Sequence, residues 1–279
     1  MSMMQVGKGN GNQPVELFFQ DIGSGQPVVL IHGWPVSHAM WEHQMLALPA
    51  QGLRVIAYDR RGFGASSKPW DSYDYDTFAD DLKALLDGLD LKDVVLVGFS
   101  MGGGEVARYM SRHGGARVSK VVFISAVTPF LQKTADNPDG VDESVFAGMV
   151  DGIKKDRPDF LTSFGKQFFN VGLLRHPVSD AMLDWSRSLA LPASPKATID
   201  CVRAFSGTDF RDDLKAIKVP VLIVHGDADN TVPIKVSGAR TAQMMPGAQY
   251  KVYDGAPHGL YETHHEELNR DLVAFVKGA

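Results

Sequence analysis

The stretch that most constrains the fold is the apolar run Val94–Val97 together with the glycine-rich sequence Gly98–Gly104 that follows it. Three of the four residues in the run are β-branched, which is typical of a buried strand. A G-x-S-x-G pattern centred on Ser100 comes next and leads into a helical pattern that begins near Glu105. A strand, a sharp turn and a helix form the context in which a serine is held at the apex with its hydroxyl exposed. The glycines of the pattern permit close backbone approach and strained dihedral angles.

The rest of the chain alternates apolar runs with amphipathic helical patterns. Strands are predicted at 15–20, 27–31, 54–58, 118–124, 219–224 and 249–253, and helices at 78–89, 233–245 and in the closing segment to residue 276. This alternation predicts an α/β fold, a mostly parallel twisted sheet with helices on both faces. Residues 130–211 contain many aromatic residues but no convincing strand, so we interpret them as an inserted helical cap. Residues 1–129 and 212–279 would then form the core.

Charge and composition exclude several classes of partner. The chain has 28 basic and 33 acidic residues and a net charge of −5, with no long basic run. Grooves for nucleic acid and contacts with anionic membranes need clustered Lys and Arg, so neither partner is expected. No segment approaches the ~20 apolar residues of a membrane span, and residues 1–12 lack the apolar core of a signal peptide. The single cysteine, Cys201, fits a reducing compartment, and a cytoplasmic location is predicted.

Three loops that follow predicted strands carry residues suited to acyl transfer. They hold Ser100, the acids Asp227 and Asp229, and His258. The carboxyl ends of parallel strands share one edge of a sheet, so these loops should lie close together. A serine hydroxyl needs an imidazole to take its proton and a carboxylate to orient that imidazole. The order Ser, Asp, His along the chain is the order expected for this fold class. The residues alone do not decide between the two acids, since one of them is expected to cap the loop backbone.

Several motifs together make a more specific pattern. The chain resembles the cofactor-free bacterial haloperoxidase and arylesterase branch of the α/β-hydrolase family. The residues that carry the resemblance are His32–Pro35, Tyr58–Gly64, Gly98–Gly104, Val127–Pro129, Ala197–Cys201 and Ala256–Gly259. The resemblance extends from about the first predicted strand to the last helix, and it implies an α/β-hydrolase fold with a cap.

The resemblance also implies roles for individual residues. The family's acid lies four residues before a proline in G-x-x-D-x-x-x-P, which selects Asp229 over Asp227. The backbone N–H groups of Met101 and Trp34 would form the oxyanion hole. No cofactor or metal is implied. The substrate pocket would be lined by Trp34, Val127, Phe164, Phe168 and Thr231.

These residues predict a serine carboxylesterase that hydrolyses small aryl or short-acyl esters through an acyl-enzyme. The alternative is a cofactor-free haloperoxidase or perhydrolase, in which hydrogen peroxide takes the acyl group and forms a peracid. A cis Trp34–Pro35 bond would turn the Trp34 carbonyl toward peroxide, whereas a trans bond would leave a rigid loop without that role. Amidase and lactonase activity stay open because they use the same chemistry. A non-catalytic binding module is disfavoured by the complete Ser, Asp and His set. The family often forms homo-oligomers, although no surface stripe specifies one here.

Overall fold

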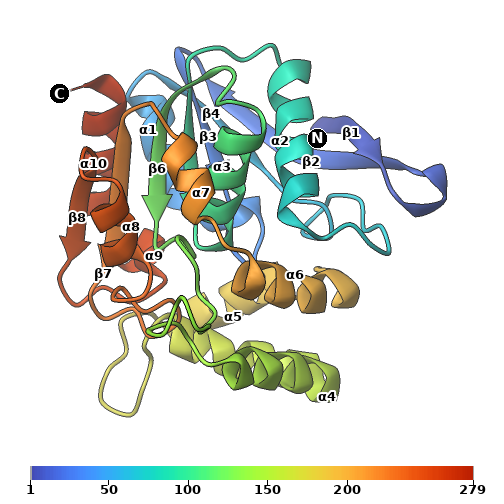
Figure 1. The fold of residues 1–279 in the computed structure, drawn as a ribbon, viewed down its shortest axis with the longest axis vertical. Helices are drawn as coiled ribbons and strands as arrows, with labels where there is room; N and C mark the ends of the chain where they lie inside the picture. Colours follow the sequence, from blue (N-terminus) through green and yellow to red (C-terminus); the bar gives the residue numbers. More distant parts are fainter. Residues whose placement is uncertain (1, 279) are drawn as a thin grey trace.

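The computed structural model describes residues 2–278 and is built around one eight-stranded sheet (Figure 1). Its strand order is β1-β2-β4-β3-β5-β6-β7-β8, with β1 and β2 antiparallel to their neighbours and the remaining pairs parallel. The predicted α/β fold with a mostly parallel sheet is therefore confirmed. The strands are β1 (Ser2–Lys8), β2 (Pro14–Gly23), β3 (Gln26–Ile31), β4 (Leu53–Tyr58), β5 (Val94–Phe99), β6 (Val118–Ile124), β7 (Val221–Gly226) and β8 (Gln249–Tyr253).

Helices follow most of the strands. Within residues 2–278, none of them is long and apolar enough to cross a bilayer. The α-helices are α1 (Glu42–Ala50), α2 (Tyr75–Gly88), α3 (Met101–Arg112), α4 (Glu143–Phe168), α5 (Asp180–Ala190), α6 (Pro195–Gly207), α7 (Arg211–Ala216), α8 (Gly238–Met244), α9 (Leu260–Thr263) and α10 (His265–Lys277). Two short 3₁₀ helices span Asn10–Asn12 and His38–Trp41.

Both faces of the central strands are buried because their apolar residues alternate between two cores. Val29 and Ile31 pack in the core that includes α2 and α3, whereas Val28 and Leu30 pack in the core that includes α1 and α10. Successive side chains of a strand point to opposite faces, so an uninterrupted apolar run fills both layers at once. This arrangement explains why the runs lack the polar alternation of a one-sided sheet.

The first strand was not expected from the sequence. Within the described part of the chain β1 is an edge strand that pairs only with β2, and its Met4 and Val6 pack partly buried against the core. The polar and glycine-rich composition of residues 1–12 gave no signal of a strand. The pairing with β2, which sequence reasoning cannot see, provides the rest of the stabilisation.

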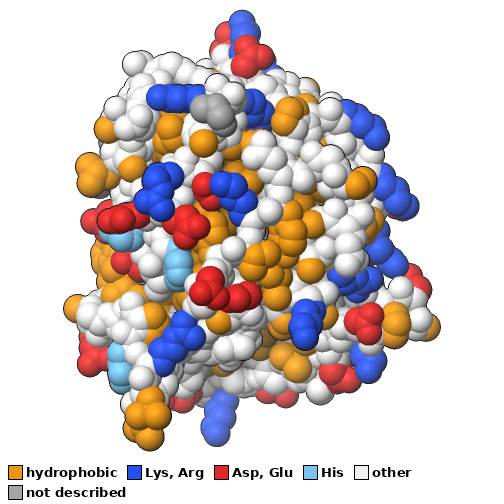
Figure 2. Space-filling model, turned by 90° about the vertical axis from the view of Figure 1, so that its left-hand side faces the viewer, with side chains coloured by type: hydrophobic (Ala, Val, Ile, Leu, Met, Phe, Trp, Pro, Cys, Tyr) orange, Lys and Arg blue, Asp and Glu red, His pale blue; other side chains and the backbone are white. Residues whose placement is uncertain are grey.

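The other edge of the sheet is β8. Figure 2 shows this side of the molecule, where apolar side chains are exposed among charged ones. The exposed apolar side chains of β8 include Tyr250 and Val252, while Lys251 pairs with Asp271 of α10 at 2.6 Å. Charged residues at an edge strand discourage pairing with another chain.

Two helix boundaries differ from the sequence prediction. The helix after β5 begins at Met101 rather than near Glu105, although glycine disfavours helix. Close packing explains these glycines, since a Cβ on Gly103 would lie 2.4 Å from the Cβ of Ala126. The helix predicted from residue 233 spans only Gly238–Met244.

The region between β6 and β7 contains α4 to α7 and no strand among the described residues. Figure 1 shows α4, α5 and α6 lying together beyond the arrowheads of the central strands. Helix α4 is interrupted at Asp156, which has non-helical dihedral angles and precedes Pro158. The side chain of Asp156 accepts a hydrogen bond from the N–H of Asp159, as an N-cap does, so α4 consists of two helical segments.

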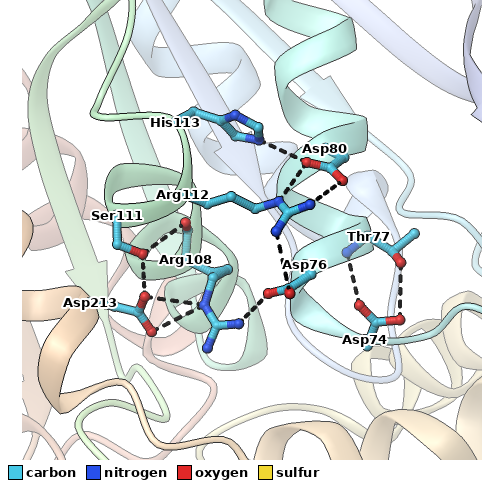
Figure 3. Close-up of polar contacts among 9 residues, drawn as sticks. All are labelled: Asp74, Asp76, Thr77, Asp80, Arg108, Ser111, Arg112, His113 and Asp213. Atoms are coloured by element: carbon cyan, nitrogen blue, oxygen red, sulfur yellow. Dashed lines mark hydrogen bonds and ion pairs between the residues drawn. The ribbon is translucent and has the colours of Figure 1, made fainter.

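A network of ion pairs holds α3 against α2 and α7 (Figure 3). Arg108 of α3 pairs with Asp76 of α2 and, at 3.1 Å, with Asp213 of α7. Arg112 adds a pair with Asp80 at 2.7 Å. Single exposed pairs contribute about 0–1 kcal/mol each, but several charges that share partners also fix geometry. The network therefore fixes the helix that directly follows Ser100.

Candidate active site

Ser100 occupies a strained turn between β5 and α3. Its dihedral angles are φ 53° and ψ −119°, a conformation that costs roughly 1–3 kcal/mol and is common at functional sites. The flanking glycines make the turn sterically feasible. A Cβ on Gly98 would lie 2.5 Å from the Gly102 carbonyl oxygen, and a Cβ on Gly102 would lie 2.5 Å from the Ile31 carbonyl oxygen.

A chain of hydrogen bonds joins the three side chains that the sequence proposed. The Nε2 atom of His258 lies 2.9 Å from Ser100 Oγ, and its Nδ1 atom lies 2.6 Å from Asp229 Oδ2. All three residues are buried. The loops after β5, β7 and β8 carry them to the same edge of the sheet. This geometry allows Nδ1–H to donate to the carboxylate while Nε2 accepts the serine proton.

The two competing acids have different partners. Asp227 accepts a hydrogen bond from the N–H of Gly255 at 2.7 Å, so it links two loops. The other oxygen of Asp229 accepts hydrogen bonds from the N–H groups of Thr231 and Val232 at 2.9 and 2.7 Å. Asp229 therefore faces His258 with its carboxylate plane fixed.

Burial by itself would raise the pKa of Asp229. The adjacent His258 and hydrogen bonds from His225 and His258 outweigh that effect and hold the pKa of the carboxyl well below its usual value. Asp229 is therefore an anion across the neutral and mildly acidic range, as an orienting carboxylate must be.

His225 is a second imidazole beside Asp229, and its place at the end of a predicted strand had suggested a buried core residue or a support for the site. It is the penultimate residue of β7, fully buried, with Nε2 2.9 Å from the Val232 carbonyl oxygen and 3.3 Å from Asp229 Oδ2. It therefore supports the loop that carries the acid. The signal in the sequence for this supporting role was the position of His225 at the end of a strand, directly before Gly226.

Two backbone N–H groups lie beside Ser100 without an internal acceptor. The amides of Trp34 and Met101 donate no hydrogen bond within residues 2–278. Met101 is the first residue of α3, where the helix dipole favours negative charge. The Trp34 loop is packed against Ser100, since a Cβ on Gly33 would lie 3.0 Å from the Ser100 Cβ. Free amides at such a place can donate hydrogen bonds to a developing oxyanion.

A buried ion pair connects the two segments that carry these amides. Arg60 Nε lies 2.6 Å from an oxygen of Glu105, which belongs to α3, and Tyr58 also donates to Glu105. The same guanidinium donates to the His32 carbonyl oxygen at 3.0 Å. Arg60 therefore ties α3 to the loop that contains Trp34.

His32 begins this loop and is held in its neutral form. Its Nδ1 lies 2.8 Å from the Gly33 carbonyl oxygen, and its Nε2 accepts a hydrogen bond from the N–H of Arg60 at 3.0 Å. Only a neutral ring can donate at Nδ1 and accept at Nε2. Burial, followed by the charge of Arg60, lowers the pKa of His32 to about 3.

This geometry predicts a pH-dependent stability. The folded-state pKa of His32 lies below the ordinary value of 6.5, so the unfolded chain takes up the proton first as the pH falls. The stability contributed by neutral His32 is complete above about pH 6.5 and is lost as the pH falls toward 3. Between pH 7 and pH 5 the expected loss is about 2 kcal/mol.

Urea unfolding at the two pH values measures this loss. The variant His32→Gln, which cannot titrate, should lose about 2 kcal/mol less than the parent chain over the same interval. The control is His176→Gln, which removes an exposed histidine and should keep the pH dependence of the parent chain's stability. An identical pH dependence in the parent and His32→Gln chains would contradict the assignment.

A cavity of about 410 Å³ opens above Ser100. Four of the five predicted pocket residues line it together with Ser100 and His258, namely Trp34, Val127, Phe164 and Thr231. The fifth, Phe168, lies outside this lining, because its ring packs edge-on against His258 with the ring centroids 4.8 Å apart. The Trp34–Pro35 peptide bond, which the sequence left open, is cis.

The end of α4 is attached to both loops that flank the cavity. The carbonyl oxygen of Phe168 accepts a hydrogen bond from the N–H of Gly259, beside His258. Asn170 donates to the Ala228 carbonyl oxygen at 2.6 Å, next to Asp229. Sequence reasoning missed Asn170, since a polar residue after a helix gives no signal of a distant partner.

Comparison with known proteins agrees with this architecture. The sequence matches the α/β hydrolase fold family over residues 26–265. It is 44% identical to a non-haem chloroperoxidase from Kitasatospora aureofaciens and 40% identical to a bifunctional esterase/perhydrolase from Acinetobacter calcoaceticus. Each alignment covers 94% of this chain and 96% of the relative.

Two solved structures are also similar to this protein over nearly the whole chain. A bromoperoxidase from Bacillus anthracis superposes with a TM-score of 0.95 and 48% identity, over 99% of both chains. An esterase from Exiguobacterium antarcticum superposes with a TM-score of 0.91 and 33% identity, also over 99% of both. The chain therefore belongs to the α/β-hydrolase family, in the branch that contains these non-haem haloperoxidases, esterases and perhydrolases.

Proposed function

We propose that this protein is a serine carboxylesterase that hydrolyses small esters with an apolar acyl or aryl group. The observation that carries the proposal is the hydrogen-bond chain from Asp229 through His258 to Ser100 at the base of an apolar cavity. An apolar cavity with few polar groups suits an uncharged ester better than a charged substrate.

In this proposal Ser100 Oγ attacks the ester carbonyl while His258 Nε2 takes the hydroxyl proton. Asp229 orients His258 and stabilises the imidazolium that forms. The amides of Trp34 and Met101 donate to the oxyanion, each such donor being worth roughly 3 kcal/mol at the transition state. His258 then gives the proton to the departing alkoxide, and the alcohol leaves.

Water completes the cycle. His258 takes a proton from water as it attacks the acyl-enzyme, and Ser100 regains that proton when the carboxylic acid departs.

The location proposed for this reaction is the cytoplasm, supported by a chain with one cysteine, Cys201. The proposed partner is a small-molecule ester.

A second reaction of the same site is favoured by the relatives. One of them is named a bifunctional esterase/perhydrolase, and others are named non-haem haloperoxidases. In that reaction a carboxylic acid acylates Ser100 with loss of water, and hydrogen peroxide then attacks the acyl group. The products are a peracid and free Ser100, and the peracid oxidises halide in solution.

A substrate panel tests both reactions. Aryl esters, lactones and anilides are assayed with purified protein, with and without hydrogen peroxide, and bromination of a phenol is followed with and without acetate. Ester hydrolysis, together with bromination that requires acetate, is expected. Absence of any p-nitrophenyl acetate turnover would overturn the esterase proposal. Bromination that needs no carboxylic acid and persists in Ser100→Ala would overturn the peracid route.

A further inference from the structure

A second hollow lies in the helical region between β6 and β7, with a volume of about 440 Å³. It is lined by residues of α4 and α6 and by Gln132, and we call it the outer groove. Its apolar part is made by Ala147, Val150 and Val202. Lys154, Arg203, Glu143 and Asp151 also line it. Because the charges are of both signs, the groove has no preference for one sign of ligand charge, and the buried Val150 and Val202 provide a surface for an apolar chain.

Phe146 separates the outer groove from the active-site cavity. Within residues 2–278 it is the one residue that lines both hollows. Its side chain is only 8% exposed, and its ring packs against Phe205 with a centroid distance of 6.4 Å. The ring therefore forms part of the wall between the two spaces.

The neighbours of Phe146 on α4 divide between the two sides of this wall. Val145 and Met149 line the active-site cavity, whereas Ala147 and Val150 line the outer groove. Residues three and four positions apart share one face of a helix, so these two sets mark two faces of α4. Phe146 stands at the boundary between those faces.

We propose that Phe146 sets the length of acyl chain that the enzyme accepts, and that the outer groove is a subsite for the distal methylenes of a longer chain once that ring is reduced. This inference rests on the proposed ester hydrolysis. With the ring in place, the acyl group is confined to about 410 Å³, which is near the lower end of the range for ligand pockets. Each further buried methylene strengthens binding about fourfold, so access to the groove has a large effect on long chains.

The first test compares p-nitrophenyl acetate, butyrate, octanoate and dodecanoate. Phe146→Ala should raise the ratio of kcat/KM for dodecanoate to that for acetate by at least about tenfold relative to the parent enzyme. The same ratio for Phe146→Leu should lie between the ratios of the parent enzyme and of Phe146→Ala. A ratio within about twofold of the parent in both variants, with acetate turnover retained, overturns the inference.

A second substitution tests whether the new space is the outer groove. Ala147→Trp, introduced into Phe146→Ala, places an indole in the groove and should return the chain-length profile toward that of the parent. If the double variant still prefers dodecanoate, the distal methylenes of that chain bind outside the outer groove, and the proposed subsite is overturned. Thermal unfolding of each variant verifies that it is folded, and Phe146→Leu decides the question if Phe146→Ala does not fold.

Dodecanoate binding gives a readout that requires no turnover. Trp34 lines the active-site cavity, so its fluorescence should report the fatty acid. The dissociation constant should fall at least about tenfold in Phe146→Ala relative to the parent. If this change occurs without ester turnover, the proposed function fails while the length inference stands. If esters are hydrolysed but neither binding nor chain-length preference changes, only the length inference fails.

Discussion

Replacing Ser100 with alanine is expected to lower kcat/KM for p-nitrophenyl acetate by about 10⁴- to 10⁶-fold. Ser100 Oγ is the atom that would bond to the acyl group, and His258 Nε2 lies 2.9 Å from it. Alanine leaves the backbone, both free amides and the cavity in place, so only the nucleophile is removed. The same substitution should abolish acetate-dependent bromination, because both reactions pass through one acyl-enzyme.

Ser125 offers a matched control for this experiment. It is a fully buried serine with a positive φ of 43°, and its hydroxyl has no hydrogen-bond partner among the described residues. Ser125→Ala should therefore keep ester hydrolysis near the parent rate. Circular dichroism and thermal unfolding verify the fold of both variants. Retention of more than about a hundredth of the parent rate by folded Ser100→Ala would remove Ser100 as nucleophile.

Replacing Asp229 with asparagine should reduce kcat by about 10⁴-fold. An amide can donate to His258 Nδ1, which stabilises the wrong tautomer and leaves Nε2 protonated, unable to accept the serine proton. It also removes the anion that stabilises the imidazolium. Steady-state kinetics with p-nitrophenyl acetate measures the effect. The pKa of Asp229 is held well below its usual value, so a fall of activity between neutral and mildly acidic pH should not arise from its protonation.

Asp227→Asn is the matched comparison, since both acids lie in the loop after β7. Asp227 accepts one backbone hydrogen bond from Gly255, and among the described residues it forms no hydrogen bond or ion pair with His258. An amide oxygen can still accept that bond, so kcat should change by no more than a few fold. Equal losses in the two variants would mean that the loop, rather than the carboxylate of Asp229, determines activity.

Much of the fold was predictable because local patterns specify it. The apolar run Val94–Val97 with the turn at Ser100 indicated a strand, a sharp turn and a helix, which the structure contains. Strand β1 was not predictable, since Ser2–Lys8 is stabilised by pairing with β2 rather than by a strong pattern of its own. The early start of α3 at Met101 was also hidden, because glycine's low propensity is outweighed by close tertiary packing.

The candidate site was predictable in its residue types and less so in its surroundings. Ser100 and His258 stand in recognisable loops, whereas the choice of Asp229 over Asp227 needed the family pattern G-x-x-D-x-x-x-P, because the residues alone left it open. Phe168 illustrates the limit, since an aromatic residue near the site can line a cavity or support an imidazole. Spacing along the chain does not distinguish these two arrangements.

The sequence by itself determined the α/β class of this protein and the order of the Ser, Asp and His residues that suit acyl transfer. Those features depend on periodicity and on turn-forming residues close together in the chain. The family resemblance selected Asp229 over Asp227, but only the tertiary structure showed that Asp229 contacts His258, that Arg60 ties the Trp34 loop to α3, and that Phe146 stands between two hollows. Such contacts join residues far apart in the sequence, and their geometry follows from the packing of whole strands and helices.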